Sequence, residues 1–153
     1  MQTFLPYHSF GESAKVLDDK RLGKQRSECM IILKTLLGVY EKEGRKGWPH
    51  HPATKMWKGH EGCLWRYSEA VCLEWESRGY KDTVRNWLLF GMGGRTVAPE
   101  GLWTEPDRYI KPPWLGDEEF HRSHRSNLLR KMPEHYRQYW PDERDDLPYI
   151  WPV

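Results

Sequence analysis

The sequence predicts a compact all-α domain whose helices are joined by long loops rich in proline and tryptophan. Apolar residues recur at intervals of three and four in several segments, which is the spacing of one buried helix face. No Asn-Gly or Asp-Gly turn separates two alternating apolar runs, so no β-hairpin is expected. The chain has 153 residues, the usual length of one domain, and residues 1–153 are therefore predicted to fold as a single unit.

The first half of the chain contains three predicted helices. Residues 9–17 form a short helix that Ser9 can cap. Residues 19–40 form a longer helix, because apolar residues recur at helical spacing until the GRKGWP sequence ends the pattern. The third helix covers residues 60–78 and stops at Gly79, which is a frequent carboxyl-terminal end signal.

The second half is predicted to contain two helices and a long loop. The first helix covers residues 82–91, with Asp82 or the threonine after it as the cap. Residues 95–116 are rich in Pro, Gly and Trp and form the long loop, a feature that is often functional. The second helix covers residues 117–131, and a short turn at 133–139 precedes an extended tail.

Overall charge gives little support to a nucleic-acid partner, so any evidence for one must come from local clusters of basic residues. The 24 Lys and Arg residues exceed the 22 Asp and Glu residues by only two, a formal net charge of +2. The nine Trp and eight Tyr residues suit a core and equally suit stacking on bases.

The cysteines and the amino terminus indicate a cytoplasmic protein. Three cysteines without a CxxC pair favour a reducing compartment, and Cys29 and Cys72 fall at apolar helical positions where buried thiols are expected. The first residues show no basic lead followed by an apolar run, and no segment has the length and apolar character to cross a bilayer. We expect a cytoplasmic monomer without membrane contact.

The sequence LDDKRLGKQRSE, residues 17–28, is the most informative about chemistry. At about 100° per residue, Arg21 and Glu28 fall on one side of the helix, at the border of its apolar stripe. A carboxylate held ionised there by Arg21 and Lys24 can stabilise a developing positive charge or move a proton. Arg26 projects toward the stripe and needs a carboxylate or a ligand phosphate. A plain surface pair of Lys24 with Glu28, with Arg26 reaching solvent, explains the same pattern without chemistry.

The sequence FHRSHRSNLLRK, residues 120–131, concentrates positive charge on a predicted helix. Such side chains bind the phosphates and bases of DNA, and the candidate contacts here are His121, Arg122, His124, Arg125 and Lys131. The two histidines share a helix face and can instead ligate a metal with His51 or His60. A metal-dependent hydrolase is therefore an alternative, although no Cys pair and no HExxH sequence supports it. We expect no metal and no cofactor.

The sequence HHPATKMWKGHE, residues 50–61, interleaves cations with an aromatic ring around a helical turn at 53–58. His51 and Trp57 can contact a nucleic-acid strand, but packing of Trp57 in the core explains the pattern equally well. Motifs of other enzyme classes are missing from the chain, since GMGG at 91–94 lacks a following GK[ST] and no GxSxG sequence occurs. Nucleotide hydrolysis and serine esterase activity are not expected.

Taken together, these segments resemble the pyrimidine-dimer DNA glycosylase and AP-lyase family of the endonuclease V type, and more closely its compact bacterial and phage relatives. The resemblance extends nearly from end to end, through MQTFLPY, LDDKRLGKQRSE, HPATKMWKGHE, PPWLGDEEFHRSHRSNLLRK and PEHYRQYW. It implies a compact all-α fold, as the helical periodicity does. It also implies that the partner is double-stranded DNA containing a damaged or modified base.

In that family a free amino-terminal amine attacks the sugar to form an imine, and a helix glutamate stabilises the charged intermediate. Glu28 matches that glutamate, and the resemblance gives Arg21 and Arg26 the role of holding phosphates. An α-amine suits the reaction because more of it is neutral at physiological pH than of a lysine amine. Gln2 is too large for ordinary removal of Met1, so either the Met1 amine serves, one residue displaced, or the imine chemistry is absent.

The sequence thus predicts a DNA N-glycosylase, with or without AP-lyase activity, that removes a damaged or modified pyrimidine. The candidate catalytic residues are Glu28, Met1 and Gln2. The alternative from another class is a nucleic-acid-binding module of the same fold without catalysis, in which Glu28 is only the structural partner of Arg26.

Overall fold

The computed structural model describes residues 1–90 and 111–153, and within these ranges it consists of eight helices and no strand. The predicted all-α fold is confirmed. The helices are α1 (Phe10–Val16), α2 (Asp19–Leu36), α3 (Val39–Lys42), α4 (Pro52–Trp57), α5 (Glu61–Ser77), α6 (Val84–Phe90), α7 (Glu118–Lys131) and α8 (Pro133–Tyr136). None of the described helices combines the length and the apolar character needed to cross a bilayer.

Side chains just before the helices explain where several of them begin. The Ser9 hydroxyl accepts a hydrogen bond from the backbone N–H of Glu12 and caps α1, as predicted. Asp18 caps α2 in the same way. Asp82 accepts hydrogen bonds from two backbone N–H groups in the first turn of α6, so Asp82 is the capping residue of the two that the sequence offered.

The helix predicted over 19–40 is wrong at its carboxyl end, because α2 stops at Leu36. Gly38 has a φ of 70°, in the left-handed region that a residue without a side chain enters at little cost. The chain then turns into the single turn of α3. Of the loop predicted at 95–116, residues 95–110 lie outside the described residues. Its last part, residues 111–116, contains a turn before α7.

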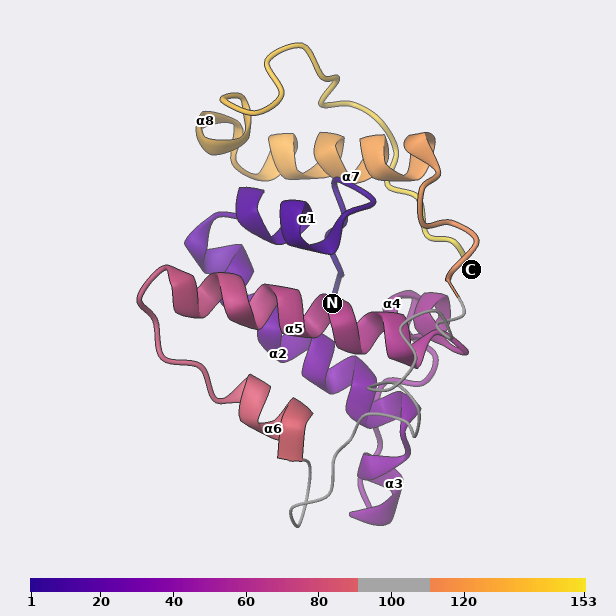
Figure 1. The fold of residues 1–153 in the computed structure, drawn as a ribbon. Coiled ribbons are helices and arrows are strands. Elements are labelled where there is room, and N and C mark those ends of the chain that lie inside the picture. The colour runs from indigo at the N-terminus through magenta and orange to yellow at the C-terminus, as the bar shows by residue number, and fades with distance from the viewer. Residues whose placement is uncertain (91–110) are drawn as a thin grey trace.

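The fold has a central helix pair with a second layer above it (Figure 1). Helices α2 and α5 pack against each other, α1 packs on α5, and α6 contacts both central helices. Helix α7 lies on the other side of the amino-terminal segment, which runs between α7 and the α2–α5 pair. The apolar core between the layers includes Leu5, Trp57, Tyr67 and Phe120, whose side chains are fully buried.

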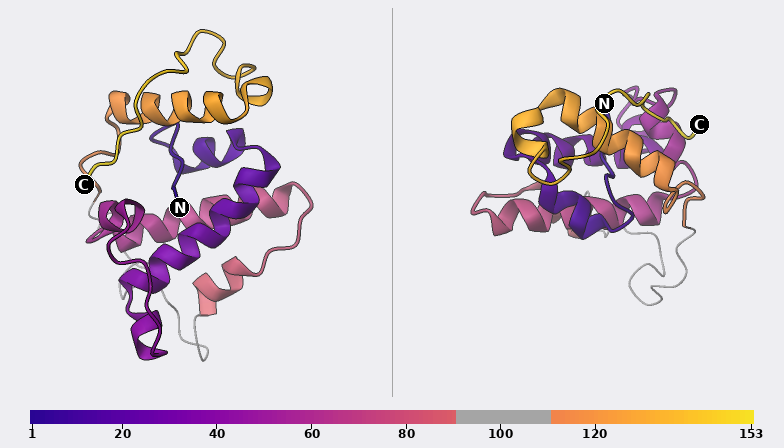
Figure 2. Two further views of the ribbon diagram at one scale, coloured as in Figure 1. Left: turned by 180° about the vertical axis from the view of Figure 1, so that it is seen from behind. Right: turned by 90° about the horizontal axis from the view of Figure 1, so that it is seen from above.

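The chain after α8 returns along α7 and ends near α4, as both views of Figure 2 show. Arg130 donates hydrogen bonds to the carbonyls of Asp145 and Leu147. The hydroxyl of Ser126 accepts a hydrogen bond from the Leu147 N–H. This carboxyl-terminal tail therefore covers the outer face of α7 and fixes it over the amino-terminal segment.

Candidate active site

The amino-terminal segment, residues 2–6, has no regular secondary structure and is held by side chains of the surrounding helices. On the α2–α5 side, the amide of Gln25 accepts a hydrogen bond from the Phe4 N–H at 2.8 Å and donates one to the Gln2 carbonyl at 2.9 Å. The Tyr67 hydroxyl donates to the Phe4 carbonyl. Buried backbone groups must find partners, and here side chains provide them.

On the α7 side, two histidines and an arginine hold the same segment. Nδ1 of His124 accepts a hydrogen bond from the Leu5 N–H at 2.9 Å, and Nδ1 of His121 lies 2.7 Å from the Leu5 carbonyl, to which it donates. Arg125 donates to the Pro6 carbonyl at 2.7 Å. These predicted DNA contacts therefore lie inside the protein, where they fix the backbone.

Burial also keeps both histidines neutral. Desolvation lowers the pKa of His121, and it lowers the pKa of His124 to about 3. Neutral histidines cannot supply positive charge to a DNA backbone. Within residues 1–90 and 111–153, no group of three or more His, Cys, Asp or Glu side chains is arranged to hold a metal ion. The alternative of a hydrolase with a metal bound by His51, His121 and His124 thus has no support in this part of the chain.

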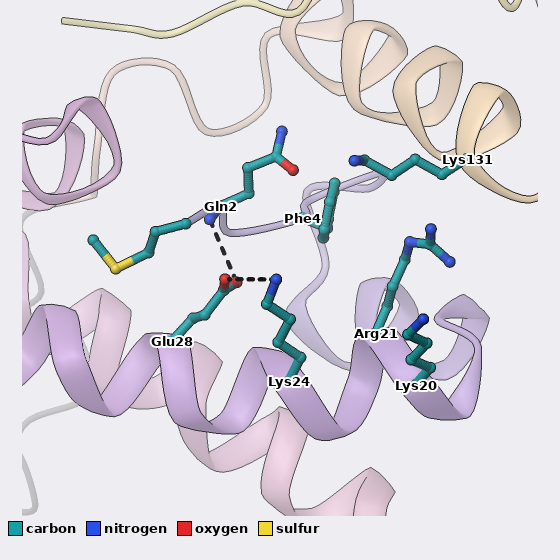
Figure 3. A pocket seen from close by; sticks show the side chains of 8 residues that line it. Gln2, Phe4, Lys20, Arg21, Lys24, Glu28 and Lys131 are labelled. Carbon is teal, nitrogen blue, oxygen red and sulfur yellow. Dashed lines mark hydrogen bonds and ion pairs between the residues drawn. The ribbon is translucent and has the colours of Figure 1, made fainter.

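The segment leads to the carboxylate of Glu28 (Figure 3). The Gln2 N–H lies 3.4 Å from Glu28 Oε2, and Lys24 Nζ lies 3.7 Å from Oε1. Glu28 itself is 9% exposed, which agrees with the border position predicted for it. A pocket of about 250 Å³ opens beside the carboxylate, and it is lined by Met1, Gln2, Phe4, Lys20, Arg21, Lys24, Glu28 and Lys131.

Four cations line the pocket beside Glu28. Lys20, Arg21 and Lys24 come from α2, and Lys131 comes from the end of α7, so the two layers meet at the pocket. The Arg21 guanidinium is held in place by Asp18, 3.1 Å away. Sequence reasoning missed Lys20, although it precedes Lys24 by four residues and therefore lies on the same helix face. A pocket with this charge suits the phosphates of a nucleic acid.

A second cavity, of about 390 Å³, also has Glu28 in its lining. Its lining residues are Met1, Lys24, Ser27, Glu28, Ile31, Trp48 and His51. Met1, Lys24 and Glu28 line both hollows, so Glu28 borders a cationic pocket and a largely apolar one. His51 was a predicted site residue, whereas Ile31 and Trp48 were not.

Arg26, by contrast, lies outside both hollows. Its guanidinium pairs with Asp82, which follows α5, and stacks over the Trp75 ring at 4.4 Å from the centroid. The alternative in which Glu28 serves as the structural partner of Arg26 is therefore wrong, because the carboxylate that pairs with Arg26 is Asp82. A sequence pattern within one helix could not reveal a partner 56 residues away.

Two further predicted contacts take part in packing or in ion pairs. The Trp57 side chain is fully buried and its indole N–H donates to the Thr3 hydroxyl at 3.0 Å, so the core interpretation of Trp57 is confirmed. Arg122 forms an ion pair with Glu143, 3.0 Å away, and Arg125 binds the same carboxylate. Of the five candidate contacts on α7, Lys131 lines the pocket beside Glu28.

Comparison with known proteins points to a single family. The family model for pyrimidine dimer DNA glycosylases matches residues 1–87. That range includes the amino-terminal segment, both central helices and Glu28. No curated protein and no solved structure matched the chain.

Proposed function

The chain belongs to the pyrimidine dimer DNA glycosylase family, whose members are DNA-repair enzymes, and we propose that its reaction centre is the amino-terminal amine together with the Glu28 carboxylate. The observation that supports this proposal is the 3.4 Å distance from the Gln2 N–H to Glu28 Oε2. The Met1 amine belongs to the residue just before Gln2, and Met1 lines the pocket beside Glu28. A nucleophile fixed beside a carboxylate is the arrangement that this chemistry needs.

In the proposed reaction the neutral amine attacks C1′ of the target nucleotide. The bond from C1′ to the base breaks, and the base leaves with the electron pair of that bond and takes up a proton. The amine then loses a proton, the bond from C1′ to O4′ breaks, and O4′ keeps the electron pair and takes up a proton. The products are an open sugar and a protonated imine between the protein and C1′. Glu28 can accept the proton that the amine loses and pass it to O4′, and the carboxylate, ionised again, then stabilises the positive charge of the imine.

The imine has two possible fates, and both are part of the proposal. Water can add to it, which releases the amine and leaves an abasic site. Alternatively, a base removes a proton from C2′ and the 3′ phosphate oxygen leaves with the electrons of its bond, which cuts the strand. The cations of the pocket, Lys20, Arg21, Lys24 and Lys131, would hold the flanking phosphates of the duplex during either step.

Reductive trapping tests the reaction centre. Borohydride reduces an imine to a stable amine, so the protein should form a covalent complex with duplex DNA that carries an abasic site or a damaged pyrimidine. Mass spectrometry of the complex should place the sugar on Met1, or on Gln2 where Met1 has been removed. We expect Glu28→Gln to slow trapping by about 10²- to 10⁴-fold, the usual contribution of a positioned acid or base.

A matched control is available on α5. Glu74 is also a partly buried helix glutamate with a basic partner four residues away, Arg78, and it lies outside both hollows. Glu74→Gln should trap DNA at the wild-type rate. Failure to trap any abasic or damaged substrate, or a sugar attached to a lysine, would contradict the proposed centre.

A further inference from the structure

We propose that Met1 is a positioning residue: its side chain packs at the border of the two hollows and thereby holds the α-amine of the same residue beside Glu28. This inference rests on the proposed function, since it takes the terminal amine to attack the sugar. It goes further in two respects. It assigns the reacting amine to a retained Met1, and it gives the Met1 side chain a role in the reaction.

The backbone that follows Met1 is held by two side chains of α2. The Gln2 N–H lies 3.4 Å from Glu28 Oε2 (Figure 3), and the Gln2 carbonyl accepts a hydrogen bond from the Gln25 amide at 2.9 Å. The peptide bond between Met1 and Gln2 is planar, so these contacts also restrict the Met1 carbonyl group. The main freedom left to the amine is rotation about the bond from the Met1 Cα to its carbonyl carbon.

This rotation moves the amine and the side chain of Met1 together, because both are bonded to the same Cα. A contact that holds the side chain therefore also sets the direction of the amine. Direction matters because a nucleophile reacts fast only when it is already aimed at the atom that it attacks. An amine without such an anchor has to lose the entropy of this rotation before each reaction.

The Met1 side chain has apolar surroundings that can hold it. It is partly buried, it packs against the core, and it lines both hollows. The larger hollow also has Ile31 and Trp48 in its lining, and the Trp48 N–H donates to the Thr35 hydroxyl of α2 at 3.3 Å. An unbranched thioether adapts to an irregular apolar wall of this kind. The residue that carries the amine is thus anchored through its side chain.

His51 gives a second indication of where the amine lies. Its ring lines the same cavity as Met1 and Glu28. Burial lowers the pKa of His51, and the positive charge of the amino terminus lowers it further, whereas the Glu28 carboxylate acts in the opposite direction. The amine and the carboxylate are therefore both close enough to act on this one ring, as expected for an amine held at the border of the two hollows.

The test changes the first residue while keeping the length of the chain. Each protein, including the wild type, is released from a leader that a protease removes without leaving a residue behind. Borohydride trapping on abasic duplex DNA is then followed with the DNA at a saturating concentration. Met1→Gly keeps the amine but lacks the anchor. Its trapping should be slower by about 5- to 30-fold, which corresponds to the cost of fixing the backbone of one residue.

Two further variants control the comparison. Met1→Leu keeps an apolar side chain of similar volume and should restore trapping to nearly the wild-type rate. Met30→Ala shortens another partly buried methionine that packs against the core but lines neither hollow. Trapping per folded molecule of Met30→Ala should equal that of the wild type.

Binding and stability separate a positioning role from a merely structural one. A duplex with a tetrahydrofuran at the target position cannot form an imine, so it reports binding alone. Met1→Gly should bind this duplex with nearly the wild-type affinity, and its thermal unfolding should be close to that of the wild type. The loss should then appear in the rate of the covalent step, as expected when only the aim of the amine has changed.

The possible outcomes separate this inference from the proposed function. Equal trapping rates for Met1→Gly and the wild type would overturn the inference, as would a Met1→Leu variant that is as slow as Met1→Gly. Mass spectrometry of the protein expressed without a leader should show the sugar on Met1. A sugar on Gln2 would overturn the inference and leave the proposed reaction centre intact. A wild-type protein that fails to trap would instead refute the reaction centre.

Discussion

Replacing Gln25 by methionine should release the amino-terminal segment from α2 while nearly preserving the buried volume. The Gln25 side chain is 1% exposed and makes two hydrogen bonds to the backbone of that segment. Loss of the first leaves the buried Phe4 N–H without a partner, which costs about 1–3 kcal/mol. Loss of the second, to the partly buried Gln2 carbonyl, costs about 1 kcal/mol. The free energy of unfolding should fall by about 2–4 kcal/mol in total.

Urea unfolding measures this change, and thermal unfolding should show a melting temperature lowered by about 4–16 °C for a chain of this length. Trapping of abasic DNA, measured where Gln25→Met is still folded, should fall by about 10²-fold, because a displacement of about 1 Å has that effect on a reacting group. Gln138→Met is the control, since that side chain is exposed and its hydrogen bond among the described residues is to the His135 carbonyl. Wild-type stability together with wild-type trapping in Gln25→Met would refute the view that Gln25 positions the amine.

Three other predictions concern pH, a buried ion pair and salt. Because burial lowers the pKa of His124 to about 3, only the unfolded chain takes up this proton between pH 6.5 and about 3. The contribution of the neutral His124 to the free energy of unfolding is complete above pH 6.5 and falls by about 1.4 kcal/mol for each pH unit below 6.5. His124→Asn keeps an acceptor for the Leu5 N–H. This variant should therefore flatten the pH dependence of urea unfolding. Asp82→Asn should lower the free energy of unfolding by about 3 kcal/mol, because it leaves Arg26 without its carboxylate. Trapping per folded molecule should stay unchanged. Slower trapping would mean that the Arg26–Asp82 pair supports the reaction centre. The four cations of the pocket predict a slope of about −3.6 when the logarithm of the affinity for DNA is plotted against the logarithm of the salt concentration. Lys131→Ala should reduce the magnitude of this slope by about 0.9. An unchanged slope would exclude a phosphate contact at Lys131.

The helices could be predicted from the sequence because their buried faces repeat at regular intervals. In α5, for example, Leu64, Tyr67 and Val71 follow the helical period and all three are fully buried. The border position of Glu28 followed from the same geometry, and the pocket beside it contains Arg21 and Lys24 as the helix face suggested. Local periodicity is sufficient where a property depends on one helix.

The roles of the α7 side chains could not be predicted in this way. His121 and His124 are residue types that bind phosphates on a surface and equally satisfy buried backbone groups. Which of these occurs is decided by Leu5, whose N–H and carbonyl need partners and which is more than a hundred residues away in the sequence. Trp48 was missed for a related reason: its N–H donates to Thr35, and the Thr35 hydroxyl donates to the Ile31 carbonyl, both on α2.

The route of the amino-terminal segment has a consequence for how the reaction centre is made during folding. Its hydrogen bonds join residues 21, 63 and 119 positions apart, so each closes a long loop and none can form from local contacts. Such non-local contacts repay their entropy only after the helices that supply them have come together. On a growing polypeptide, Leu5 leaves the ribosome 119 residues before His124 and has to wait for it. Chains that stall before α7 can therefore form α2 and expose Glu28, but Leu5 still lacks the two histidine partners that complete the support of the amino-terminal segment.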